Sequence, residues 1–122
     1  MNKTTTYEEC ILNDRYIHSH EREIAELLDK HDLSFIYRQP TYMYDLDYRP
    51  CIASPSFTIG TLKDLIVDYS PLYNSFDQDY KKKMYEQNDL DAIVINRAYF
   101  EKDKWEQKLY HDIITITNGQ IY

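Results

Sequence analysis

The sequence has few of the residues that mark turns and interrupt helices. Its 122 residues include only two glycines and four prolines, and they contain no repeat and no low-complexity segment. No apolar run approaches the length needed to cross a bilayer. Hydrophobic periodicity must therefore indicate the elements, and we expect one soluble domain over 1–122. Within it, 1–16 is expected to be an N-terminal extension, 17–116 the core and 117–122 a C-terminal tail.

Cysteine and the common catalytic motifs are also scarce. Cys10 and Cys51 are far apart and show no metal-ligand spacing, which favours free thiols in a reducing compartment. Glu8 and Glu9 lie where a secretory signal would need an apolar segment. There is no glycine-rich phosphate loop and no GxSxG motif, so kinase, hydrolase and dehydrogenase functions have no support. We therefore predict a cytoplasmic protein.

Basic charge is in deficit, whereas tyrosine is abundant. The formal net charge is −7, and such a surface repels phosphate backbones unless a local basic patch overrides it. The same charge suits a basic protein partner. Thirteen tyrosines, each with an apolar ring and a polar tip, either cover the sheet and helices of a thin domain or form an interface.

Hydrophobic periodicity predicts three helices and several strands. A helix is expected over 20–31 with Ser19 as its N-cap, and a second from Ser75 to about 87, with Phe76, Tyr80 and Met84 on one face. A closing helix is expected over 105–116. The predicted strands are 33–37, 41–44, 55–59, 65–69 and 92–95. The pair 55–59 and 65–69 should form a hairpin, and 92–95 should be buried on both faces.

Four phrases in this order resemble a known family. They are Ser-His-Glu-Arg-Glu-Ile at 19–24, Phe-Ile-Tyr at 35–37, Pro-Ser-Phe at 55–57 and Leu-Ile-Val-Asp-Tyr at 65–69. Together they resemble small members of the PD-(D/E)XK nuclease superfamily, including Vsr-like and resolvase-like nucleases, over roughly 17–116. The resemblance implies an α/β fold with a restriction-endonuclease-like core, in the order αβββαβα, and a mixed central sheet flanked by helices.

The resemblance also implies a degenerate active site. In this superfamily two carboxylates on adjacent strands hold a divalent ion, and a nearby lysine orients or deprotonates the attacking water. In this chain Ser56 replaces the first acid, Asp68 is the second acid, and Ser70 occupies the lysine position. A hydroxyl lacks the charge needed to dehydrate Mg²⁺, so Asp68 alone would hold the ion weakly unless Glu21 or Asp64 joined it.

Three functional hypotheses follow. The first is a degenerate nuclease-like domain that binds nucleic acid or a nucleic-acid-processing protein, with a viral or mobile-element source as a further guess. The second is an active Mg²⁺-dependent endonuclease with Asp68, Glu21 and a migrated lysine from the run 81–83, with Lys82 and Lys83 as the catalytic candidates. The third is an acidic protein-interaction module or homodimer with a contiguous tyrosine-rich patch away from Asp68. A nucleic-acid groove would be lined by the following basic residues: Arg38, Arg49, Lys63 and Lys81.

The histidines suggest two further arrangements. His18 and His20 resemble the paired histidines of HUH endonucleases, with Tyr80 as the nucleophile, but Ser19 between them is not the apolar residue that such enzymes use. A zinc site with His31 and His111 would lack partner cysteines. Surface histidines are the simpler interpretation.

Overall fold

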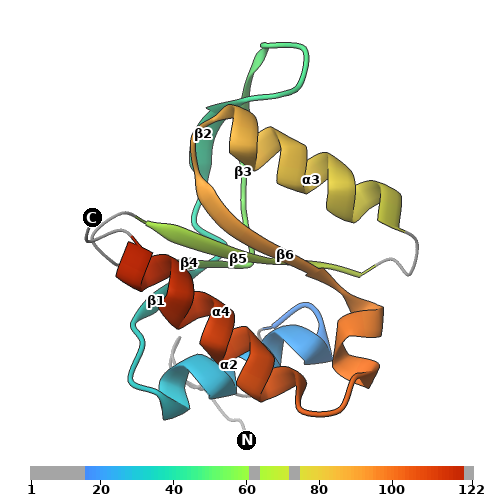
Figure 1. Ribbon diagram of the computed structural model, residues 1–122. Helices are drawn as coiled ribbons and strands as arrows, with labels where there is room; N and C mark the ends of the chain where they lie inside the picture. Colours follow the sequence, from blue (N-terminus) through green and yellow to red (C-terminus); the bar gives the residue numbers. More distant parts are fainter. Residues whose placement is uncertain (1–15, 61–63, 72–74, 120–122) are drawn as a thin grey trace, which may run out of the picture.

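The central sheet has four strands and lies between two layers (Figure 1). The computed structural model describes residues 16–60, 64–71 and 75–119. The strands of the sheet, in spatial order, are β1 (Phe35–Tyr37), β4 (Phe57–Ile59), β5 (Leu65–Ser70) and β6 (Asp91–Asn96). β1 pairs antiparallel with β4, β4 pairs antiparallel with β5, and β6 runs parallel to β5. The sheet is therefore mixed, and the fold is α/β.

Two helices cover one face of the sheet. They are α2 (Ser19–Lys30) and α4 (Trp105–Gly119), and a short 3₁₀ helix, η2 (Arg97–Glu101), precedes α4. The apolar residues of both helices recur at helical spacing and face the sheet. Those buried against it include Ile24, Leu28, Leu109 and Ile113. Of the described helices, none is both long and apolar enough to cross a membrane.

The opposite face carries helix α3 (Ser75–Gln87) and a separate hairpin (Figure 1). The hairpin consists of β2 (Thr41–Tyr44) and β3 (Pro50–Ala53), which pair only with each other in the described part of the chain. Met43 points inward and packs in a small cluster with Ile66, Met84 and Val94. Because side chains alternate along a strand, Tyr42 and Tyr44 point outward.

One side chain closes the outer edge of the hairpin. The amide of Asn88 accepts a hydrogen bond from the Tyr44 N–H at 2.8 Å and donates one to the Tyr44 carbonyl at 2.7 Å. It also donates to the Met84 carbonyl at 2.7 Å. Asn88 therefore ties β2 to the end of α3.

The structure confirms the predicted helices and the hairpin of β4 and β5, and it corrects several details. Five strands precede α3, whereas periodicity predicted four and the order αβββαβα has three. Strand β3 was missed, and the β2–β3 hairpin stands outside the main sheet. The N-cap of α2 is His18, and Ser19 is the first helical residue. Strand β6 is covered on both faces, as expected, because Val94 is buried in the cluster on the α3 face and Ile95 in the core beneath α2 and α4. The other residues of this outer strand are only half-buried.

The inward face of α3 was also predicted incorrectly. Phe76 and Tyr80 are exposed, and only Met84 of the predicted apolar face is buried. The side chains that contact the sheet face include Asp77 and Lys81, because the residues opposite them on β5 are polar.

Candidate functional site

Pairing of the strands brings polar residues into one row across the sheet. The register Phe57↔Val67 places Ser56 opposite Asp68, and the Arg38 N–H donates to the Ser56 carbonyl at 3.0 Å. Along β5, alternate residues face opposite sides. Leu65 and Val67 belong to the core beneath α2 and α4, whereas Asp68 and Ser70 bond to side chains of α3.

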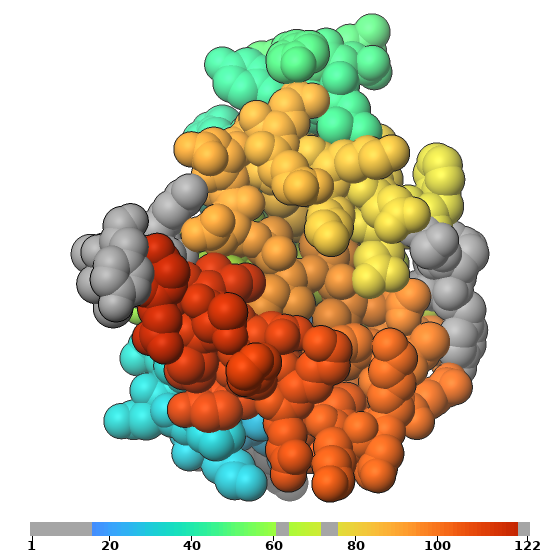
Figure 2. Space-filling model, in the orientation of Figure 1, coloured from blue at the N-terminus to red at the C-terminus, as the bar shows by residue number. Residues whose placement is uncertain are grey.

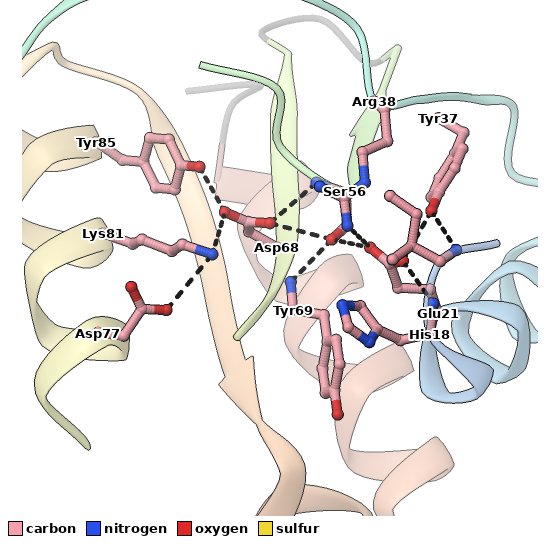
Figure 3. Close-up of polar contacts among 11 residues, drawn as sticks. His18, Glu21, Tyr37, Arg38, Ser56, Asp68, Tyr69, Asp77, Lys81 and Tyr85 are labelled. Carbon is pink, nitrogen blue, oxygen red and sulfur yellow. Dashed lines mark hydrogen bonds and ion pairs between the residues drawn. The ribbon is translucent and has the colours of Figure 1, made fainter. Parts of the chain in front are cut away.

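Ser56 lies at the centre of this site (Figure 3). Its Oγ is 2.5 Å from Glu21 Oε2 and 3.1 Å from Asp68 Oδ1, and it accepts a hydrogen bond from the Tyr69 N–H at 3.1 Å. A hydroxyl has one proton, so it donates to only one of the two carboxylates at a time. Ser56 thus joins an acid on a helix to an acid on a strand.

Glu21 is fully buried near the start of α2, with 0% of its surface exposed. Its carboxylate accepts hydrogen bonds from the Tyr37 hydroxyl at 2.7 Å, the Arg38 Nη2 at 2.8 Å and the His18 N–H at 3.3 Å. Burial of Arg38 acts to lower the pKa of its guanidinium, but the hydrogen bond with Tyr37 and the charges of Glu21 and Asp68 outweigh burial and raise that pKa. Arg38 therefore stays charged beside Glu21.

Asp68 is 3% exposed, and hydrogen-bond donors surround its carboxylate as they surround that of Glu21. Oδ1 accepts the Ser56 N–H at 2.9 Å, and Oδ2 accepts the Tyr85 hydroxyl at 2.6 Å. Lys81 Nζ lies 3.7 Å from Oδ2 and 3.6 Å from Asp77. Burial, followed by the charge of Asp68 and the hydrogen bond with it, raises the pKa of Tyr85 well above its ordinary value. Tyr85 therefore remains a proton donor.

Most polar groups of the site have partners within the chain, although Arg38 Nε is buried without a hydrogen-bond partner among the described residues. Three carboxylates, Glu21, Asp68 and Asp77, face two cations, Arg38 and Lys81, so most of the negative charge is balanced within the chain. Among the described residues, no group of three or more histidine, cysteine, aspartate or glutamate side chains is arranged to hold a metal. An Mg²⁺ ion needs an almost ideal octahedron of oxygen ligands, whereas donor groups occupy this centre.

The structure brings together only part of the predicted site. Asp68, Glu21 and Ser56 meet, and the lysine near them is Lys81, which we had placed in the nucleic-acid groove. Lys82 and Lys83, expected to be catalytic, are exposed, and Lys82 faces the space between α3 and α4. Ser70 is buried and donates to Asp77 at 2.5 Å.

Two of the four predicted nucleic-acid residues are engaged inside the chain. Arg38 and Lys81 are engaged with Glu21 and Asp68. Arg49 lies in the hairpin turn, where its N–H donates to the Asp45 carboxylate at 3.0 Å. Lys63 lies outside the described residues, as does Cys10, whereas Cys51 is a free, half-buried thiol.

The histidines have ordinary structural partners. His20 stacks on Phe100 with ring centroids 4.1 Å apart and bonds to Glu23 at 3.1 Å. His31 stacks on Tyr110 at 3.8 Å. These contacts favour the interpretation of structural and surface histidines over a zinc or HUH site.

Exposed aromatic and apolar residues gather on the outer side of the β2–β3 hairpin. Tyr42 is 85% exposed and Tyr48 74%, and Tyr44 and Ile52 are also exposed. Tyr42 lies directly opposite Ile52 in the hairpin register. This surface is the kind of tyrosine-rich patch that the protein-interaction hypothesis requires.

Sequence reasoning missed Tyr37, Asp77 and Tyr85 as members of the site. Asp77, Lys81 and Tyr85 recur every four residues, so they share one face of α3. That spacing was a usable signal, but the apolar residues Phe76 and Tyr80 suggested a different inward face. Comparison with known proteins adds nothing to this geometry, because no family model, curated protein or solved structure matches the chain.

Proposed function

We propose that the chain is a catalytically degenerate, nuclease-like domain that acts by binding a protein partner. The main support for the proposal is the environment of the Glu21 and Asp68 carboxylates. Both carboxylates are buried, and the hydroxyl of Ser56 lies between them, where an active nuclease of this type has the first acid of its motif and a metal. A scissile phosphate has no open route to them.

The arrangement of the elements supports the nuclease-like part of the proposal. If the β2–β3 hairpin is regarded as an insertion, α2 precedes three antiparallel strands, α3 follows them, and the parallel strand β6 and helix α4 complete the chain. This is the order αβββαβα that the resemblance implies. Ser56 and Asp68 also fall opposite each other on adjacent strands, as the two acids of the motif should.

Charge supports a protein partner over nucleic acid. With a net charge of −7, and with Arg38 and Lys81 engaged internally, the chain has little to offer a phosphate backbone. The exposed aromatics of the hairpin are typical of protein interfaces. The resemblance favours a partner from nucleic-acid processing, and the acidic surface favours one that is basic.

A restored acid provides the sharpest test of the site. Ser56→Asp would place a third carboxylate beside Glu21 and Asp68, and the buried negative charge should destabilise the fold without metal. Mn²⁺ should then raise the melting temperature of Ser56→Asp in a concentration-dependent way, because it binds the folded state alone. Ser56→Asn, which has a similar shape but no charge, is the matched control and should not respond. A folded Ser56→Asp protein that ignores Mn²⁺ would contradict a nuclease-like site.

One observation favours the active enzyme as a second candidate. Lys81 lies 3.7 Å from Asp68, so an acid and a lysine do meet without the sequence motif. Purified protein should be incubated with labelled single-stranded, duplex and branched DNA and with RNA, in Mg²⁺ or Mn²⁺. We expect no cleavage. Cleavage that Asp68→Ala and Lys81→Ala both abolish would establish the enzyme and overturn the binding role.

A further inference from the structure

The outer strand β6 lies at the floor of a groove. In Figure 1, β6 passes between α3 and α4, and in Figure 2 its orange surface is visible between the gold α3 and the red α4. The groove has a volume of about 430 Å³, which is in the range of ligand sites. Four consecutive strand residues, 92–95, line it, and they extend about 13 Å.

The backbone of β6 is available for pairing along this groove. β6 pairs with β5 on one side and with no other described strand. The Val94 carbonyl points outward and already accepts a hydrogen bond from Gln78 Nε2 at 2.7 Å, so a bound segment would have to displace the Gln78 side chain there. Backbone groups two residues apart on a strand point the same way, so the polar groups of Ala92 also face the groove. The strand contains no proline and no lysine, the usual features that protect an outer strand.

Tyr99 provides a second indication that the groove binds a ligand. Its ring lines the groove, and its hydroxyl is buried without a hydrogen-bond partner among the described residues. Burial, followed by the charge of Asp112, raises the pKa of Tyr99 to about 12, so the hydroxyl keeps its proton. A buried hydroxyl without a partner is unfavourable, and the carbonyl of a bound peptide would satisfy it.

The walls determine the chemistry of the occupant. The α4 wall presents Ile116 and Thr115 beside Tyr99, and two aspartates, Asp79 and Asp112, face one lysine, Lys82. Asp112 also pairs with Lys108 at 3.4 Å, so the preference for a cationic segment rests on the net charge of −7 of the chain as a whole. A second copy fits poorly, because its own β6 would be recessed between the same two helices and the strands would not meet. A single extended segment fits between the walls.

We propose that β6 binds an extended, cationic peptide segment of a partner protein by strand addition, with alternate side chains against Tyr99 and Ile116. The inference rests on the proposed protein-binding role and names the chemistry of one partner segment. With only about four residues paired, the complex should be transient, because so small an interface lies below the usual range of stable complexes.

The test uses defined peptides, measured by fluorescence polarisation. The probe is an eight-residue peptide that alternates valine and lysine, and the controls alternate valine with glutamate or proline with lysine. The valine-lysine peptide should bind saturably. The glutamate peptide should fail because of its charge, and the proline peptide because it lacks half of the amide donors.

Variants of the groove locate the binding. Ala92→Pro removes an outward amide on an outer strand, where proline is tolerated, and should weaken binding about tenfold. Thr115 is exposed, so Thr115→Arg should place a cation in the groove without harm to the fold and should abolish binding, whereas Thr115→Gln, similar in reach but neutral, should weaken binding less. Tyr99→Phe should weaken binding without lowering stability.

Three results would overturn the proposal. They are the absence of binding by any peptide, equal binding of the lysine and glutamate peptides, and unchanged binding by Ala92→Pro and Thr115→Arg. A dimeric mass in solution that the peptide dissociates would make a second copy the occupant instead. If the peptides do not bind, the results of the Mn²⁺ titration of Ser56→Asp and of the cleavage assay are unchanged. The experiments therefore distinguish a failure of this inference from a failure of the proposed function.

Discussion

The two faces of strand β5 are equally buried but have different chemistry. Toward α2 and α4 the strand presents Leu65, Val67 and Tyr69, which join a continuous apolar core. Toward α3 it presents Ile66, Asp68 and Ser70, and all three are also buried. Burial alone therefore does not make a face apolar. The α3 face tolerates a carboxylate because hydrogen-bond donors surround it, and that dependence can be tested.

The largest effect is expected from Asp68→Ala. The change leaves Lys81, Tyr85 and the Ser56 N–H without their shared acceptor, and breaking a buried charge pair costs about 3–5 kcal/mol in the free energy of unfolding. Urea denaturation measures it. Asp64→Ala, at an exposed carboxylate four residues earlier, should change stability by less than about 0.5 kcal/mol. Equal effects of the two variants would show that the polar face contributes no specific stability.

Leu109→Ala tests the apolar face in the same way. Leu109 is completely buried, and its truncation should cost about 2–5 kcal/mol through lost transfer energy and a cavity. Since no charge is involved, the loss should be the same in low and high salt, measured by urea denaturation. A salt-dependent loss would mean that the two faces are coupled.

Ser56→Ala should have a smaller effect than either. It removes the hydroxyl that joins Glu21 and Asp68 and should cost about 1–3 kcal/mol by thermal denaturation. Thr58 provides the matched control on the same strand, because its buried hydroxyl has no partner among the described residues. Thr58→Val should be neutral or slightly stabilising. If both variants behaved alike, the hydrogen bonds of Ser56 would not matter.

The smallest effect is expected from Tyr85→Phe, on the decrease of stability at alkaline pH. The pKa of Tyr85 is raised in the folded state, so above about pH 10 the unfolded chain releases a phenolic proton that the folded chain keeps. Stability therefore falls as pH rises, by about 1.4 kcal/mol for this group between pH 9 and pH 11. Tyr85→Phe should remove that part of the slope in urea titrations at pH 9, 10 and 11. Parallel slopes would contradict the assignment.

The sequence predicted most elements, because helices and strands have distinct periods. Strand 41–44 and the helix from Ser75 to about 87 were predicted with their actual bounds. Strand β3 was missed because Pro50 and Cys51 do not alternate clearly and β3 gains its stability from pairing with β2. Spacing along the chain does not reveal pairings of that kind.

The site was predictable only where the resemblance gave positions. Glu21, Ser56 and Asp68 do meet, and of the lysine run 81–83 it is Lys81, not the named candidates Lys82 and Lys83, that lies beside Asp68. Three consecutive lysines, 81–83, point about 100° apart around a helix, so the rotation of α3 decides which one reaches the sheet. Two exposed aromatics, Phe76 and Tyr80, suggested the wrong rotation, because apolar residues at a surface resemble those of a core.

The Asn88 side chain has a consequence for assembly. With one amide it makes both of the bonds that an incoming strand would make at Tyr44, one as donor and one as acceptor. An aspartate in its place would have no proton to donate, and an alanine would leave both groups open. Exposed strand edges are the templates on which chains polymerise into fibres. Asn88 therefore blocks the addition of a strand to β2 at Tyr44.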